Sequence, residues 1–199
     1  MKRTYRIAKS IGAALLWVCA IVALPEVSPA QTWVASTGTV DSSSLLTYQF
    51  NNGAAYVRSG LHSGTVILRY NVLPVGDLIV PLTNPCCEGR ALWVRFLDNG
   101  NNAQVIVKLK QYNVITGAIT TLLSFDSNNY PSAPTFQQAL SSPTSLGPFF
   151  NFSFADGPFN GPSNNGGDSV YYIETTLIRT GGGGTPALAS VGIVRTLPP

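Results

Sequence analysis

The chain has 199 residues, of which 45% are hydrophobic and 11% charged, and its formal net charge is +3. This length suits one domain with a real core. The positive charge belongs to the N-terminal segment described next, so the composition supports no nucleic-acid partner.

The N-terminal segment has the pattern of a secretory signal peptide. A basic stretch over residues 1–9 precedes an apolar run over residues 11–24, and Val27-Ser28-Pro29-Ala30 supplies small residues before a cut. The apolar run is shorter than the roughly 20 residues that a membrane-spanning helix needs. We therefore predict cleavage after Ala30, so that residues 1–30 form a signal peptide and residues 31–199 a single domain.

Removal of this segment changes the charge of the protein. The segment carries four of the 12 basic and one of the 9 acidic residues, so eight of each remain and the net charge is zero. Such a surface has little colloidal repulsion, which favours association. An uncleaved anchor is the alternative. A lipoprotein signal at Cys19 is disfavoured, because Trp17 and Val18 precede it instead of small residues. We expect a secreted or cell-surface protein, with a periplasmic location also open and no membrane span after cleavage.

Three central segments alternate between apolar and polar residues with the period of two that predicts β-strands. They cover residues 64–72, 91–98 and 103–113. In the last of them, Val107 and Leu109 share one face and Lys108 and Lys110 the other. One apolar and one charged face are typical of an antiparallel sheet with one side in water.

Further strands are expected over shorter segments, separated by turn residues such as the glycines at 181–184. Many short strands at this spacing predict an all-β protein, an antiparallel β-sandwich of the jelly-roll type. The shorter segments cover residues 33–40, 45–50, 54–58, 78–82, 119–125, 149–154, 169–180 and 187–196.

One short helix is predicted in a crossover connection. Thr135 and Gln138 have the spacing of a capping box, in which two side chains bond the free N–H groups of a helix start. Phe136 and Leu140 are four residues apart and would share a helix face. Pro143 would end the helix.

The sequence holds no obvious catalytic constellation. His62 is the only histidine, lies in a turn-like segment, and is interpreted as a solvent-facing turn residue. Most acidic residues fall in predicted turns; only Glu174 lies mid-strand, where we expect it to pair with an arginine such as Arg179 or Arg95. We therefore predict a non-enzymatic protein without a cofactor. The alternative is a jelly-roll glycosidase or lyase, for which two carboxylates at a set separation are needed.

Two short motifs have structural interpretations. Asp98 to Asn102 offers oxygen ligands of the kind that Ca²⁺ accepts, but a hairpin turn favours the same residue types, so we predict a turn and leave calcium open. Cys86 and Cys87 are adjacent in an exported chain, where disulfides are permitted. Neighbouring Cα atoms lie about 3.8 Å apart, less than the usual disulfide span of roughly 4.4–6.8 Å. A strained vicinal disulfide is preferred over cross-links to other chains or free thiols.

The outward face of the central strands is the candidate binding surface. If those strands pair as neighbours, six aromatic or basic residues share it: Arg69, Trp93, Arg95, Lys108, Lys110 and Tyr112. Aromatic rings beside hydrogen-bonding side chains suit a glycan, whereas an ordinary wet sheet face with a covered Trp93 is the alternative. We expect an extracellular binding or structural module.

Self-assembly is a second hypothesis. Residues 33–47 are rich in Ser and Thr, alternate, and lack Pro, so they could add as a strand to a neighbouring subunit's sheet. The protein would then be a homo-oligomeric cell-surface or filament subunit. The same residues could equally form the first strand of their own sandwich, which is favoured.

Overall fold

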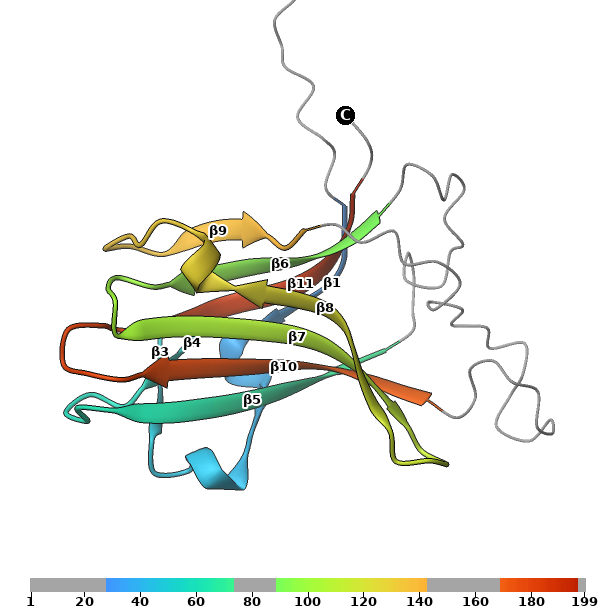
Figure 1. Cartoon of the computed structure of the whole chain (residues 1–199), viewed down its shortest axis with the longest axis horizontal. Helices are drawn as coiled ribbons and strands as arrows, with labels where there is room; N and C mark the ends of the chain where they lie inside the picture. The colour runs from blue at the N-terminus through green and yellow to red at the C-terminus, as the bar shows by residue number, and fades with distance from the viewer. Residues whose placement is uncertain (1–27, 74–88, 143–168, 197–199) are drawn as a thin grey trace, which may run out of the picture.

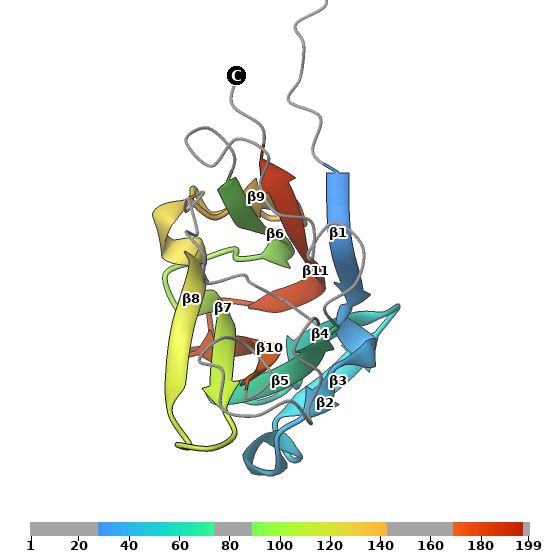
Figure 2. The same ribbon diagram turned by 90° about the vertical axis from the view of Figure 1, so that its right-hand side faces the viewer.

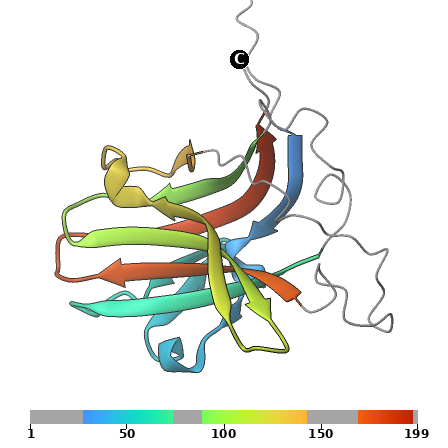
Figure 3. The same ribbon diagram turned by 45° about the vertical axis from the view of Figure 1, so that its right-hand side comes forward.

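Two antiparallel sheets pack face to face (Figure 1). Apolar side chains at every second position of their strands form the core between them. The computed structural model describes residues 28–73, 89–142 and 169–196. Figure 3 gives an oblique view of the two layers. The five-stranded sheet runs in the order β2 (Thr39–Val40), β5 (Gly64–Val72), β10 (Ser169–Arg179), β7 (Ala103–Asn113) and β8 (Ile119–Asp126).

The six-stranded sheet lies behind the first. Its strands run in the order β3 (Tyr48–Asn51), β4 (Ala54–Val57), β11 (Ala187–Thr196), β6 (Gly89–Leu97) and β9 (Gln137–Leu140). The sixth strand, β1 (Ser28–Val34), pairs with β11 beyond the end of β4 (Figure 2). Most strands that follow each other in the chain, such as β4 and β5 or β5 and β6, therefore belong to opposite sheets; β3 and β4, and β7 and β8, are the pairs that stay together.

A chain that passes back and forth between two sheets in this way has the jelly-roll arrangement. The orders β4-β11-β6-β9 and β5-β10-β7-β8 place the eight strands of a jelly roll four in each sheet, and β1, β2 and β3 extend the two sheets. The predicted antiparallel, jelly-roll-like sandwich is confirmed. Within the described ranges, no helix has the length and apolarity that a membrane crossing requires.

Aromatic side chains join the two sheets at the core. Phe96 of β6 meets Phe125 of β8 edge to face with ring centroids 5.0 Å apart, and Tyr130 stacks on Phe125 at 5.1 Å. Tyr70 is only 2% exposed, and its hydroxyl donates to the Ala35 carbonyl at 3.1 Å. Burial raises the pKa of Tyr70, so this hydroxyl remains a donor.

The helix predicted around Thr135 to Leu140 is wrong, because Gln137–Leu140 forms strand β9. These residues pair with Trp93 to Phe96 of β6, and the Tyr130 hydroxyl donates to the Leu140 carbonyl at 2.6 Å. A helix of one turn gains few hydrogen bonds for its nucleation cost. Pairing with β6 provides hydrogen bonds at once, so the tertiary context overrides the capping pattern.

The N-terminal stretch is divided between the two sheets. Its predicted strand over residues 33–40 is broken by a 3₁₀ turn, η1 (Ala35–Thr37), and continues as β2 in the other sheet. Trp33 pairs with Val191 of the same chain, so this stretch is the first strand of its own sandwich. The predicted cut after Ala30 falls within β1 and would leave its paired residues 31–34 in place. The predicted strands over residues 78–82 and 149–154 lie outside the described residues.

Candidate functional site

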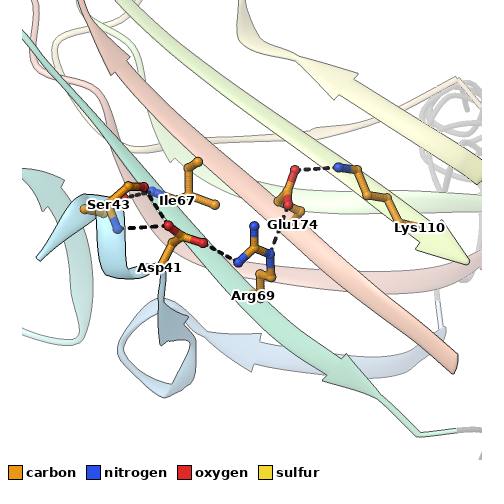
Figure 4. A network of polar contacts seen from close by, with 7 residues as sticks. Asp41, Ser43, Ile67, Arg69, Lys110 and Glu174 are labelled. Atoms are coloured by element: carbon orange, nitrogen blue, oxygen red, sulfur yellow. Dashed lines mark hydrogen bonds and ion pairs between the residues drawn. The ribbon is translucent and has the colours of Figure 1, made fainter. Parts of the chain in front are cut away.

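Charged side chains meet on the outer face of the five-stranded sheet, where β5, β10 and β7 lie side by side (Figure 4). Glu174 is at the centre of β10. In the strand register it lies opposite Arg69 of β5 on one side and Lys108 of β7 on the other. Residues directly opposite each other on neighbouring strands point to the same side of a sheet, so these three side chains share the solvent-facing side.

Four of the charged residues form a continuous chain of ion pairs. The Glu174 carboxylate accepts a hydrogen bond from Arg69 Nε at 3.0 Å and another from Lys110 Nζ at 2.6 Å. Arg69 Nη1 also donates to Asp41 Oδ2 at 2.5 Å. We call Asp41, Arg69, Glu174 and Lys110 the ion-pair chain; it links β5, β10 and β7 to the segment that follows β2.

Asp41 is held in place by the turn that it begins. It caps the 3₁₀ turn η2 (Ser42–Ser44), and its Oδ1 accepts hydrogen bonds from Ser43 N at 3.0 Å and Ser43 Oγ at 2.6 Å. Ser44 Oγ in turn accepts from Ile67 N of β5 at 2.9 Å. The carboxylate is therefore positioned beside Arg69 by local backbone geometry before any ligand arrives (Figure 4).

The hydrogen bonds and charges in the ion-pair chain favour the ionised forms of its two carboxyl groups, Asp41 and Glu174. The hydrogen bonds from the Ser43 side chain and backbone, followed by that from Arg69, lower the pKa of Asp41 to about 2. Burial by itself would raise the pKa of Glu174. The hydrogen bonds and charges of Lys110 and Arg69 outweigh this effect and lower the pKa below its ordinary value.

These pKa shifts predict a loss of stability in acid. A carboxyl group with a lowered pKa stabilises the folded state above its unfolded pKa, and this contribution is lost as pH falls through the folded pKa. We expect the melting temperature to fall between about pH 4 and about pH 2. Asp41→Asn should melt at a lower temperature at neutral pH and show a smaller drop across this window. Parallel melting curves for the two proteins across the window would contradict the role of Asp41.

Two tyrosines lie beside the ion-pair chain on the same face. Tyr172 precedes Glu174 by two residues and pairs with Lys110 of β7 and Asn71 of β5. Tyr112 follows Lys110 by two residues on β7, and both rings are partly exposed. Lys108 is partly exposed, and none of the ion pairs among the described residues involves it. Donors, acceptors and ring faces are thus available on one surface.

The predicted six-residue surface is divided by the fold, so its placement on one face is wrong. Trp93 and Arg95 lie on β6, which belongs to the six-stranded sheet, where they pair with Gly192 and Ser190 of β11. Arg69, Lys108, Lys110 and Tyr112 remain together on the five-stranded sheet. The period of two shows which residues share a face of one strand. It does not show which sheet the strand joins.

Glu174 does pair with an arginine, Arg69, and also with Lys110, but not with Arg179 or Arg95, the two examples given from the sequence. Arg179 lies at the end of β10, where its Nη1 donates to the Leu61 carbonyl at 3.1 Å. Arg95 is on the other sheet. Tyr172 and Asp41 also belong to this surface, although neither was predicted as a site residue. Alternation along β10 could have placed Tyr172 beside Glu174, whereas nothing local indicated that Asp41 meets Arg69.

The polar side chains of the turn at Asp98 bind neighbouring loops of the same chain. Asp98 is 5% exposed and its Oδ2 accepts a hydrogen bond from Ser127 Oγ at 2.6 Å, while Asn99 Oδ1 accepts from Thr185 N at 2.6 Å. Over the described ranges, no group of three His, Cys, Asp or Glu side chains is placed to hold a metal ion.

His62 is exposed in its turn, as predicted. Cys86 and Cys87 lie outside the described residues.

Comparisons with known proteins give only distant similarities. No protein-family model matches the sequence, and no curated protein matches it. Similar solved structures include a family two carbohydrate esterase from Cellvibrio japonicus, with 11% identity and a TM-score of 0.36, over 84% of this chain and 35% of that one. Infectious bursal disease virus Gt strain has 13% identity and a TM-score of 0.32, over 87% and 33%. The VP2 subviral particle of infectious bursal disease virus has 14% identity and a TM-score of 0.32, over 84% and 33%. This chain spans about a third of the length of these structures. Similarity at this level assigns no activity or ligand to it.

Proposed function

We propose that the protein is a secreted, non-enzymatic β-sandwich module that binds a glycan through the outer face of the five-stranded sheet. The observation that carries this proposal is the position of Tyr172 beside Lys110 and Glu174 in the strand register. Sugar rings have apolar faces that stack on aromatic rings and hydroxyl groups that need donors and acceptors. This surface offers both within neighbouring strands.

The ion-pair chain favours binding over a merely solvated surface. Arg69, Glu174 and Lys110 restrain one another, so little side-chain entropy would be lost when a ligand contacts them. Their hydrogen-bonding capacity is not exhausted, because an ammonium group has three donors and a guanidinium five. Lys108, which has no ion pair among the described residues, adds a further donor beside Glu174.

The same geometry supports a non-enzymatic role. Glycoside hydrolysis by paired carboxylates needs one of them protonated as the general acid, which requires a raised pKa. On this face the pKa values of Asp41 and Glu174 are both lowered, and Arg69 stands between the two carboxylates.

The proposed export of the protein rests on the signal-peptide pattern of residues 1–30.

A glycan array followed by titration calorimetry on the best ligand tests the proposal. Tyr172→Ala should weaken binding about tenfold, since an aromatic contact contributes about 1.4 kcal/mol. Trp93→Ala is the matched control, because it removes an aromatic ring from the outer face of the opposite sheet, and it should bind like the wild type. Thermal melts of both variants would show that they remain folded.

Three results would overturn the proposal. The wild type could bind no glycan on the array. Tyr172→Ala could bind as tightly as the wild type. Finally, Trp93→Ala could lose binding while Tyr172→Ala retains it, which would move the site to the other sheet.

A further inference from the structure

The five-stranded sheet ends in a long strand whose outer edge has no partner among the described residues. This strand, β8, has 8 residues and is the last strand in the order of its sheet (Figure 2). The edge strands β2, β3 and β9 have 2, 4 and 4 residues. The other long edge strand, β1, contains Pro29. A strand at an edge leaves half of its backbone N–H and C=O groups available to another chain.

The composition of β8 does little to prevent pairing. Proteins commonly protect edges with short strands, charges, Pro or bulges. Residues 119–125 read Ile-Thr-Thr-Leu-Leu-Ser-Phe, without a charge or Pro. A register shift opposite Leu109 and Lys110 is the one protective feature of the strand. Ile119 at its start is 57% exposed. High β-propensity combined with low charge is the signature of a segment that adds to another strand.

The charge nearest to this edge is turned back onto its own sheet. Asp126, the only charged residue of β8, accepts hydrogen bonds from Gln104 Nε2 at 3.0 Å with both of its carboxylate oxygens. Lys110, one strand further in, is paired with Glu174. Two copies of this edge would therefore meet with little electrostatic repulsion, in keeping with the zero net charge expected after cleavage.

We propose that two copies of this chain associate by antiparallel pairing of their β8 edges, which joins two five-stranded sheets into one continuous sheet. A second copy suits the edge because antiparallel pairing of identical strands is self-complementary about a two-fold axis. The pairing uses the edge and leaves the outer face accessible. It therefore does not rest on the glycan proposal.

Sedimentation velocity over a wide concentration range tests the pairing. The wild type should shift from monomer to dimer as its concentration rises. Thr121→Lys places a cation at the edge, next to Lys110 and close to its two-fold copy, and should raise the dimer dissociation constant about tenfold or more. Thr65→Lys is the matched control: it makes the same change at an exposed residue of β5, and should dimerise like the wild type.

Hydrogen exchange locates the interface independently. Amides of residues 119–126 should exchange more slowly at high than at low concentration in the wild type, and this difference should vanish in Thr121→Lys. A monomer at every concentration, equal dimerisation of the two lysine variants, or a dimer without added protection of β8 would each overturn the inference. Glycan titrations on monomeric Thr121→Lys keep this outcome separate from that of the proposed function.

Discussion

Gly184→Ala is expected to lower the free energy of unfolding by about 3 kcal/mol, because the added methyl group has no space. A Cβ built on Gly184 would lie 2.7 Å from Ala103 N and 2.8 Å from Asn102 C. These are backbone atoms at the end of the β6–β7 turn and the start of β7, and they cannot rotate away as the end of a side chain can. Relief would require the β10–β11 loop to move off the β6–β7 turn.

Hydrogen bonds fix the loop on both sides of Gly184. Thr180 N donates to the Asn102 carbonyl at 3.0 Å, and Thr185 N donates to Asn99 Oδ1 at 2.6 Å. Displacing the loop would therefore break contacts as well as strain the backbone. Gly183→Ala is the control within the same glycine run, since its Cβ would meet only Asn102 Nδ2, at 3.6 Å.

Urea unfolding of the two variants measures the difference. Gly183→Ala should stay within about 0.5 kcal/mol of the wild type, as a surface substitution does. Equal stability of the two alanine variants would mean that the loop relaxes freely, and would contradict the close packing described for Gly184.

Glu174→Lys should cost about 3 kcal/mol, which makes it the largest effect expected on the outer face. It removes two partly buried ion pairs, each worth about 1 kcal/mol. It also places a cation among Arg69, Lys108 and Lys110, and like charges on facing strand positions destabilise a sheet. High salt should recover part of the loss, because it screens partly exposed charges.

A charge exchange separates pairing from simple loss of the carboxylate. In the double variant Lys110→Glu with Glu174→Lys, the contact between β7 and β10 is restored with the signs reversed. Chemical unfolding should show recovery of about a third to a half of the lost stability, because Arg69 still faces a cation. If the double variant is no more stable than Glu174→Lys alone, the ion pair contributes nothing.

Most strands could be predicted because their signal is local. Residues 64–72 and 103–113 were predicted with the bounds of β5 and β7, since alternation and the flanking turn residues lie within a few positions of each other. The helix predicted over residues 135–140 is wrong for the opposite reason. A local capping pattern was outweighed by pairing with β6, a strand more than forty residues earlier, as the 49-residue separation of Leu92 and Ser141 illustrates.

The surface was predicted in part. Lys108 and Lys110 were placed together on the outward side of one strand, and they lie there. Trp93 was placed with them because β6 and β7 are consecutive, but these two strands belong to opposite sheets. No feature near Trp93 shows which sheet β6 joins, because the alternation of apolar and polar residues along β6 fits a strand in either sheet.

The sequence by itself determined most of the described strands, the face of each that is buried, and the antiparallel sandwich, because these depend on alternation and turn chemistry between near neighbours. The tertiary structure decided which charges meet. Arg69 and Glu174 are 105 residues apart, and only the pairing of β5 with β10 brings their side chains within hydrogen-bonding distance. Asp41 joins them because its capped turn packs on β5. The ion-pair chain is thus a product of topology, which alternation cannot encode.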